Sequence, residues 1–87
     1  MPRHELTLPE LGLPQVTPTV SVWLVEQGDE VTVGDRLLEV LCGSVTVDLS
    51  APANGVLVEV CVEEDEPLSV GQLLAVIESD ENSPPGD

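Results

Sequence analysis

Apolar and polar residues alternate along this chain between about residues 5 and 78, and glycines and prolines interrupt the alternation at short intervals. A repeat of two residues is typical of strands that bury one face, and Gly or Pro at each break indicates a turn. No segment keeps the period of an amphipathic helix long enough to predict one. The pattern therefore predicts an all-β domain of short strands over residues 5–78.

The two ends of the chain lack this alternation. Residues 79–87 read Ser-Asp-Glu-Asn-Ser-Pro-Pro-Gly-Asp, an acidic and proline-containing composition that is typical of a tail or linker. We expect residues 1–4 to form a disordered N-terminus. No apolar run approaches the roughly 20 residues of a membrane span, and no signal peptide opens the chain. The expected location is the cytoplasm, with no membrane partner.

A weak internal repeat relates the two halves of the predicted domain. Val25-Glu26 recurs 37 residues later as Val62-Glu63, and Val33-Gly34 recurs at the same offset as Val70-Gly71. Two copies of one β-unit suggest a sandwich with quasi-two-fold symmetry, because neither half could bury its apolar face alone. The same offset sets residue 44 against the end of the chain, so we expect the turn near residue 44 and the termini to lie at opposite ends.

The clearest local feature is a hairpin centred on Gly43-Ser44. A two-residue loop with Gly in its first position favours a type II′ turn. This turn would form an apolar face by pairing Cys42 with Val45, Val40 with Val47, and Leu38 with Leu49. The other face is mostly polar and carries Leu37, Glu39, Leu41, Thr46, Asp48 and Ser50. A slip by one residue would mix the two sets, so the pattern predicts one register.

The chain carries 17 Asp and Glu residues against Arg3 and Arg36, for a formal net charge of −15. Such a surface repels the phosphate backbone, so nucleic acid is excluded as a partner. The acidity could attract a basic protein partner, or it could be a solvated surface that only keeps the protein soluble. His4 is a single imidazole, and Cys42 and Cys61 supply neither a disulfide framework nor a metal site. No metal is expected.

Trp23 is the single aromatic residue of the chain. Under the repeat it matches Val60, which shares a face with Val56, Val58 and Val62, and this match favours a core position. A lone aromatic side chain can also anchor a protein partner. We predict the core role and keep the anchor as the alternative.

Five segments, in order and without gaps, resemble a known family. They are residues 8–12, 23–29, 33–40, 51–55 and 70–77, which read L-P-E-L-G, W-L-V-E-Q-G-D, V-G-D-R-L-L-E-V, A-P-A-N-G and V-G-Q-L-L-A-V-I. Over residues 5–78 the chain is similar to the lipoyl domains of dihydrolipoamide acyltransferases from 2-oxo acid dehydrogenase complexes. The resemblance implies a lipoyl/biotinyl-type flattened β-barrel, a sandwich of two four-stranded sheets with quasi-two-fold symmetry.

In that family a lysine at a hairpin tip, within E-T-D-K-A, carries lipoate through an amide bond, and the biotinyl relatives place their lysine at the same position. Counted from Val40 or from Ala51, the motif falls on residues 41–45, and the lysine position is Ser44. The chain contains no lysine, and a hydroxyl cannot form that amide. We expect no cofactor and no catalysis, since the family's carriers leave the chemistry to the cofactor.

The function that the resemblance implies is that of a degenerate, non-lipoylatable lipoyl-like domain. It would act as a structural or protein-docking module related to a 2-oxo acid dehydrogenase or acyltransferase assembly. Two alternatives stay open. The chain could carry acyl groups on Cys42 or Ser44, although no base that would activate either group lies nearby in the sequence. It could also be a passive accessory domain of a larger biotin- or lipoate-dependent enzyme.

Overall fold

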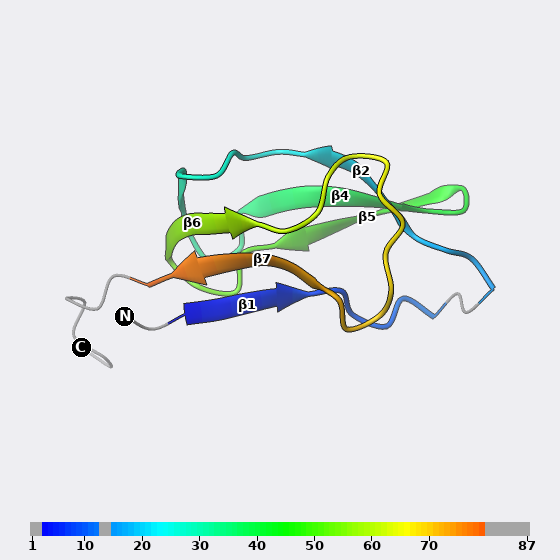
Figure 1. The fold of residues 1–87 in the computed structure, drawn as a ribbon, viewed down its shortest axis with the longest axis horizontal. Helices are drawn as coiled ribbons and strands as arrows, with labels where there is room; N and C mark the ends of the chain where they lie inside the picture. The colour runs from blue at the N-terminus through cyan, green and yellow to red at the C-terminus, as the bar shows by residue number, and fades with distance from the viewer. Residues whose placement is uncertain (1–2, 13–14, 80–87) are drawn as a thin grey trace.

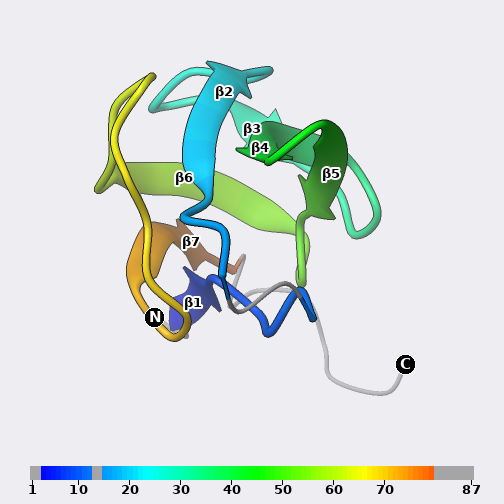
Figure 2. The same cartoon turned by 90° about the vertical axis from the view of Figure 1, so that its right-hand side faces the viewer.

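Two antiparallel sheets form the computed structural model of the chain, which describes residues 3–12 and 15–79 (Figure 1). The sheets have the strand orders β1-β7-β6-β3 and β2-β4-β5. The strands are β1 (Arg3–Thr7), β2 (Thr19–Trp23), β3 (Glu30–Val31), β4 (Arg36–Cys42), β5 (Val45–Ser50), β6 (Gly55–Val60) and β7 (Leu73–Glu78). Viewed from the hairpin end, β1 and β7 lie on the opposite side from β2, β4 and β5 (Figure 2). The predicted all-β flattened barrel is confirmed.

The second sheet has three strands where the resemblance implies four. The fourth position is held by an isolated antiparallel bridge between Thr19 and Pro67. With the offset of 37 residues, this bridge corresponds to the pairing of Glu30 with Val56 in β3 and β6. Hydrogen bonds flank this bridge on both sides, from the Val20 N–H to the Glu66 carbonyl and from the Leu68 N–H to the Pro18 carbonyl. Under the repeat the next pair, Leu68 with Pro18, corresponds to Val31 with Gly55, and Pro18 has no backbone N–H to return, so the ladder stops there.

Backbone hydrogen bonds also repeat at this offset, which confirms the quasi-two-fold symmetry. The Gly28 N–H donates to the Leu57 carbonyl at 2.7 Å, and the Asp65 N–H donates to the Val20 carbonyl at 2.8 Å. The backbone φ is 101° at Gly28 and 70° at Asp65. Aspartate tolerates this left-handed conformation better than most residues. The two loops therefore share one geometry although the central residue differs.

The core is aliphatic and takes side chains from both sheets. Its buried cluster comprises Leu6, Leu8, Val20, Val31, Leu37, Leu38, Val40, Leu49, Ala51, Leu57, Val62, Leu68, Leu74, Ala75 and Ile77. Burial of these groups is the main stabilising contribution in a domain that has a single aromatic residue.

Leu37 departs from the predicted pattern. Alternation along the hairpin puts it on the polar face, but its side chain is fully buried, as is that of Leu38. The pairing of β4 with β5 shifts between Arg36 and Leu38, so Leu37 lies at a bulge. A bulge inserts an extra residue into one strand and breaks the alternation of faces there. Two consecutive leucines can therefore both enter the core.

Trp23 packs at the rim of the core. Its side chain is partly buried against the cluster, and its indole Nε1–H donates to the Val62 carbonyl oxygen at 3.0 Å. Val60, its match under the repeat, is likewise partly buried, and Val62, which shares a face with Val60, is buried. The predicted core role is thus confirmed in part, with the polar edge of the indole satisfied by the backbone.

The N-terminal strand begins earlier than the sequence suggests. Arg3 and His4, predicted to belong to a disordered N-terminus, pair with Glu78 and Ile77 in β1 and β7. Their polar side chains give no apolar signal, and pairing with the buried strand β7 orders them. Ser79 is described, while the rest of the predicted tail, residues 80–87, lies outside the described residues.

The start of β1 and the end of β7 lie at one end of the barrel, and the β4–β5 hairpin lies at the other, as the repeat predicts (Figure 1). Over residues 3–12 and 15–79, no helix is both long enough and apolar enough to cross a membrane.

Candidate functional site at the hairpin tip

The β4–β5 hairpin has the predicted register. Cys42 pairs with Val45, Val40 with Val47, and Leu38 with Leu49. Gly43 has a φ of 67°, whereas Ser44 does not adopt a positive φ. A positive and then a negative φ at the two central positions fits a type II′ turn. The structure therefore brings Gly43 and Ser44 together at the tip, as the sequence predicts.

Exposure changes sharply around this turn. Cys42 is 1% exposed, whereas Val45, its cross-strand partner, is 50% exposed. Gly43 and Ser44 are also exposed. The apolar face of the hairpin thus runs past the end of the core. A group attached to the Ser44 side chain would extend into solvent, as a prosthetic group must if it is to move freely.

A surface hollow of about 270 Å³ adjoins the tip on the side of Cys42. It is lined by Glu10, Leu11, Val16, Thr17, Pro18, Cys42, Leu68, Ser69 and Val70. A methyl carbon of Val16 lies 3.6 Å from the position that a Cβ would occupy on Gly43. The loop after β1, the hairpin and the segment before β7 therefore meet at one place. The sequence pattern did not predict this hollow, because no periodicity links segments so far apart in the chain.

The turn itself contains no charged side chain. Residues 41–45 carry no charge. The two arginines are in exposed ion pairs, Arg3 with Glu59 at 3.7 Å and Arg36 with Asp48 at 3.2 Å. Both arginines stand at the first residue of a strand, β1 or β4, and not at the hairpin end. The tip therefore offers neither a cation nor an acid–base pair, and Glu10 is the carboxylate that lines the hollow.

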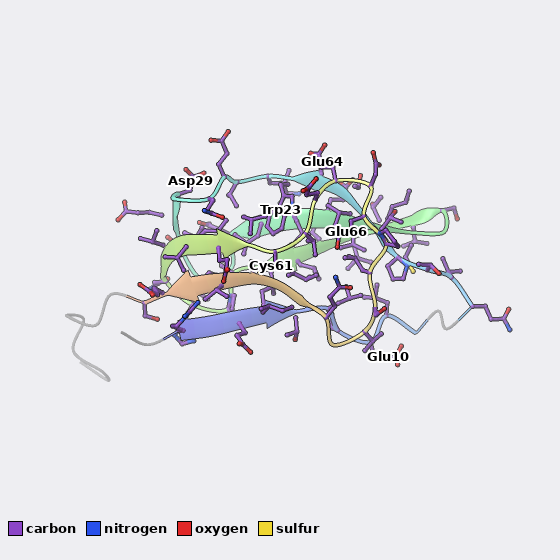
Figure 3. The ribbon with its side chains drawn as sticks, viewed as in Figure 1. Glu10, Trp23, Asp29, Cys61, Glu64 and Glu66 are labelled. Carbon is purple, nitrogen blue, oxygen red and sulfur yellow. The ribbon has the colours of Figure 1, made fainter. Side chains whose placement is uncertain are left out.

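Both cysteines are free. Cys42 is enclosed in the wall of the hollow, and Cys61 is exposed on the surface directly after β6 (Figure 3). Partial desolvation of the Cys61 thiol, together with the carboxylates of Glu59 and Glu5, raises its pKa above the ordinary value. A raised pKa lowers the thiolate fraction of Cys61 at neutral pH, so this thiol lacks the environment of an activated nucleophile.

No cluster of three or more side chains able to hold a metal ion occurs in the part of the chain that the structure describes. The turn itself offers the Ser44 hydroxyl, and the hollow beside it adds the enclosed thiol of Cys42, the Glu10 carboxylate and the hydroxyls of Thr17 and Ser69.

A flattened barrel of two antiparallel sheets with an exposed two-residue hairpin at one end is the fold of the lipoyl and biotinyl domains. The chain belongs to the family described as "Biotin-requiring enzyme", whose model matches residues 4–77. The lipoyl domain of the 2-oxoglutarate dehydrogenase complex from Azotobacter vinelandii has the same fold, with a TM-score of 0.72 and 22% identity over 87% of this chain and 98% of that one. A single-chain, multi-domain long-chain acyl-CoA carboxylase gives a TM-score of 0.74 at 20% identity, over 92% of this chain and 8% of that one.

The sequence relatives are acyltransferase components. The dihydrolipoyllysine-residue acetyltransferase component of the acetoin cleaving system of Pseudomonas putida is 40% identical over 74 residues, which are 85% of this chain and 20% of the relative. The corresponding component of the pyruvate dehydrogenase complex of Corynebacterium glutamicum is 36% identical over 77 residues, 88% of this chain and 11% of the relative. The chain thus spans a fifth or less of the length of these relatives, and it is a lipoyl domain of the kind found in 2-oxo acid dehydrogenase acyltransferases.

Proposed function

We propose that this lipoyl domain accepts neither lipoate nor biotin and serves as a structural or protein-docking module in a 2-oxo acid dehydrogenase or acyltransferase assembly. One observation carries the proposal: the chain has no lysine, and Gly43-Ser44 occupies the exposed tip of the hairpin. Attachment in this family is an amide bond to a lysine amine. The Ser44 hydroxyl stands at the matching position and cannot form it.

The docking role is supported by the apolar surface around the tip. Leu41, Val45 and Val70 are 40%, 50% and 57% exposed. Val45 pairs with Cys42, and Cys42 and Val70 both line the adjoining hollow, whereas Leu41 lies on the opposite face of the hairpin. Exposed apolar side chains that gather at one place are typical of surfaces that contact another protein. The relatives described above are themselves components of multi-enzyme systems.

An acyl carrier that works through Cys42 is disfavoured by burial. With 1% of its surface exposed, the thiol cannot meet an acyl donor unless the hairpin opens. Ser44 is accessible, but the carboxylate at the hollow belongs to Glu10 and no imidazole or amine lines it. A serine nucleophile needs such a base beside it. The non-carrier role therefore remains the better supported function.

Enzymatic attachment tests the first half of the proposal. We expect no mass gain when the chain is incubated with a lipoate ligase or a biotin ligase, ATP and the matching acid. Ser44→Lys should become an acceptor in the same assay. Gly43→Lys and Val45→Lys are matched controls with the lysine one residue away: the first forces a positive φ on lysine, and the second starts on the Cys42 face. An adduct on an internal residue of the unaltered chain, or equal modification at 44 and 45, would contradict the proposal.

Binding to purified components of a 2-oxo acid dehydrogenase complex tests the second half. We expect the chain to bind one component, and we expect Val45→Ser at the tip to weaken that affinity by roughly tenfold, in line with the loss of about 1.4 kcal/mol from one apolar contact. Val33→Ser is the control, because Val33 is similarly exposed, at 58%, but lies in the loop before β4. Equal effects of the two substitutions would exclude the tip as the docking surface.

A further inference from the structure

The dipeptide Asn54-Gly55 lies at the entrance to β6, and the structure accounts for each residue separately. A Cβ on Gly55 would collide with the carbonyl oxygen of Glu78, so glycine alone fits there. The Asn54 side-chain Oδ1 accepts a hydrogen bond from the Val33 N–H at 2.7 Å, which ties the loop after β3 to the start of β6. Packing requires glycine at position 55, and the hydrogen bond uses the asparagine at position 54. An exposed asparagine therefore directly precedes a glycine.

An asparagine that precedes a glycine is chemically labile. The glycine nitrogen can attack the asparagine Cγ, so that a C–N bond forms while the side-chain nitrogen leaves as ammonia with the proton of the glycine amide. The product is a five-membered succinimide. Water then opens the ring at either carbonyl and leaves aspartate or isoaspartate. The reaction needs no reagent other than water, and a glycine has no Cβ to hinder ring closure.

Three contacts of the folded chain oppose this reaction. The Val33 N–H holds the Asn54 side chain. The pairing of Gly55 with Val31 in the β3–β6 ladder restrains the attacking nitrogen. The Glu78 carbonyl packs directly on Gly55 and blocks rotation of its backbone. Ring closure requires both the side chain and the backbone to turn, so all three contacts must be released first.

The weakest of these restraints is the pairing with β3. This strand is two residues long, Glu30–Val31, and it forms an edge of its sheet. Short, exposed edge segments open locally at a lower free-energy cost than the core does. We propose that Asn54 is a spontaneous deamidation site whose rate is controlled by opening of the β3–β6 pair and by the hydrogen bond from Val33.

The two products differ in their effect on the fold. Aspartate at position 54 keeps an oxygen that accepts the Val33 N–H. Isoaspartate adds a methylene to the main chain and displaces Gly55 from its contact with Glu78. Through isoaspartate, a transient opening of this edge becomes a permanent covalent change.

One substitution removes the hydrogen bond and keeps the turn that supplies it. The Asp35 N–H donates to the Thr32 carbonyl at 2.9 Å, and Gly34 has a φ of 92°. Val33 therefore occupies the position before a left-handed glycine, where proline is favoured in a type II turn. Val33→Pro should preserve the turn while removing the N–H that holds Asn54.

The internal repeat provides the matched control. The Gln72 N–H donates to the Ser69 carbonyl at 3.0 Å, and Gly71 has a φ of 86°, so Val70 occupies the equivalent turn position. Val70 is as exposed as Val33, at 57% against 58%. Val70→Pro introduces the same substitution far from Asn54 in the sequence and leaves the Val33 N–H in place.

The full chain and both variants are incubated at neutral pH, in native buffer and in guanidinium chloride. Peptide mapping by mass spectrometry follows the conversion of Asn54 separately from that of Asn82. We expect the unaltered chain to convert at least about tenfold faster when denatured, because local opening then no longer limits the reaction. In native buffer Val33→Pro should convert faster than the unaltered chain, and Val70→Pro at the unaltered rate.

Two results would overturn the proposal. One is equal conversion of the unaltered chain in native buffer and in denaturant, a comparison that needs no variant to fold. The other is a folded Val33→Pro variant, verified by circular dichroism, in which Asn54 converts as slowly as in the unaltered chain.

Discussion

Leu37 and Leu41 of β4 give the sharpest test of the bulge in the hairpin. Strict alternation assigns both to the same polar face, since they are separated by an even number of residues. The structure instead buries Leu37 completely and leaves Leu41 40% exposed. Truncating each leucine to alanine should therefore have very different effects on the free energy of unfolding.

The expected magnitudes follow from burial. Leu37→Ala removes a fully buried side chain and leaves a cavity, which costs about 2–5 kcal/mol. Leu41→Ala removes carbon atoms that are already partly in water and leaves no enclosed cavity, so its cost should be about 1 kcal/mol. In a domain of this size, 1 kcal/mol lowers Tm by about 4–8 °C. Leu37→Ala should accordingly lower Tm by about 10 °C or more, and Leu41→Ala by less than about 8 °C.

Guanidinium unfolding followed by far-ultraviolet circular dichroism measures both variants, with Leu38→Ala as the control for a residue that alternation and structure both place in the core. We expect Leu37→Ala to lower the free energy of unfolding by about as much as Leu38→Ala. Equal, small losses for Leu37→Ala and Leu41→Ala would mean that β4 alternates without a bulge and that the described register is wrong.

Two further predictions concern close packing and the thiols. Gly55→Ala should destabilise the domain by several kcal/mol, about 3 or more, because its Cβ would collide with the Glu78 carbonyl in the β6–β7 pair; a variant with unchanged Tm would contradict that contact. In the folded chain an alkylating reagent should modify Cys61 and spare Cys42, which is buried. Since the pKa of the Cys61 thiol is raised, its alkylation rate should reach half-maximum at a higher pH in the folded chain than in guanidinium chloride; coincident pH–rate profiles would refute the cause assigned to the shift.

The hairpin register could be predicted from the sequence because both features that fix it, the turn and the flanking apolar residues, are local. Gly43-Ser44 sets a two-residue turn, and the apolar residues that follow on either side agree with one pairing alone. The repeat was accessible for the same reason, since turn residues recur at a fixed offset. The match of Ser44 to the family's lysine position also came from sequence, and it stays a prediction until the ligase assay is done.

Local signals do not record how distant segments pack. The bulge that buries Leu37 depends on the space available inside the closed barrel. The alternation of apolar and polar residues around Leu37 predicts an ordinary strand. Pro18 explains the missing strand of the second sheet only when Leu68 is known to lie beside it. Strand β1 extends to Arg3 because β7 is there to pair with it.

In the candidate site, too, some features follow from the local sequence and others from tertiary packing. The sequence alone determined that the tip carries a serine and no amine, and that the tip is a turn. The tertiary structure decided that Cys42 is enclosed while Val45 is open, and that Val16 packs against Gly43 beside the hollow. Burial is a property of what surrounds a residue in space, and the surroundings of this turn come from three segments that only the closed barrel brings together.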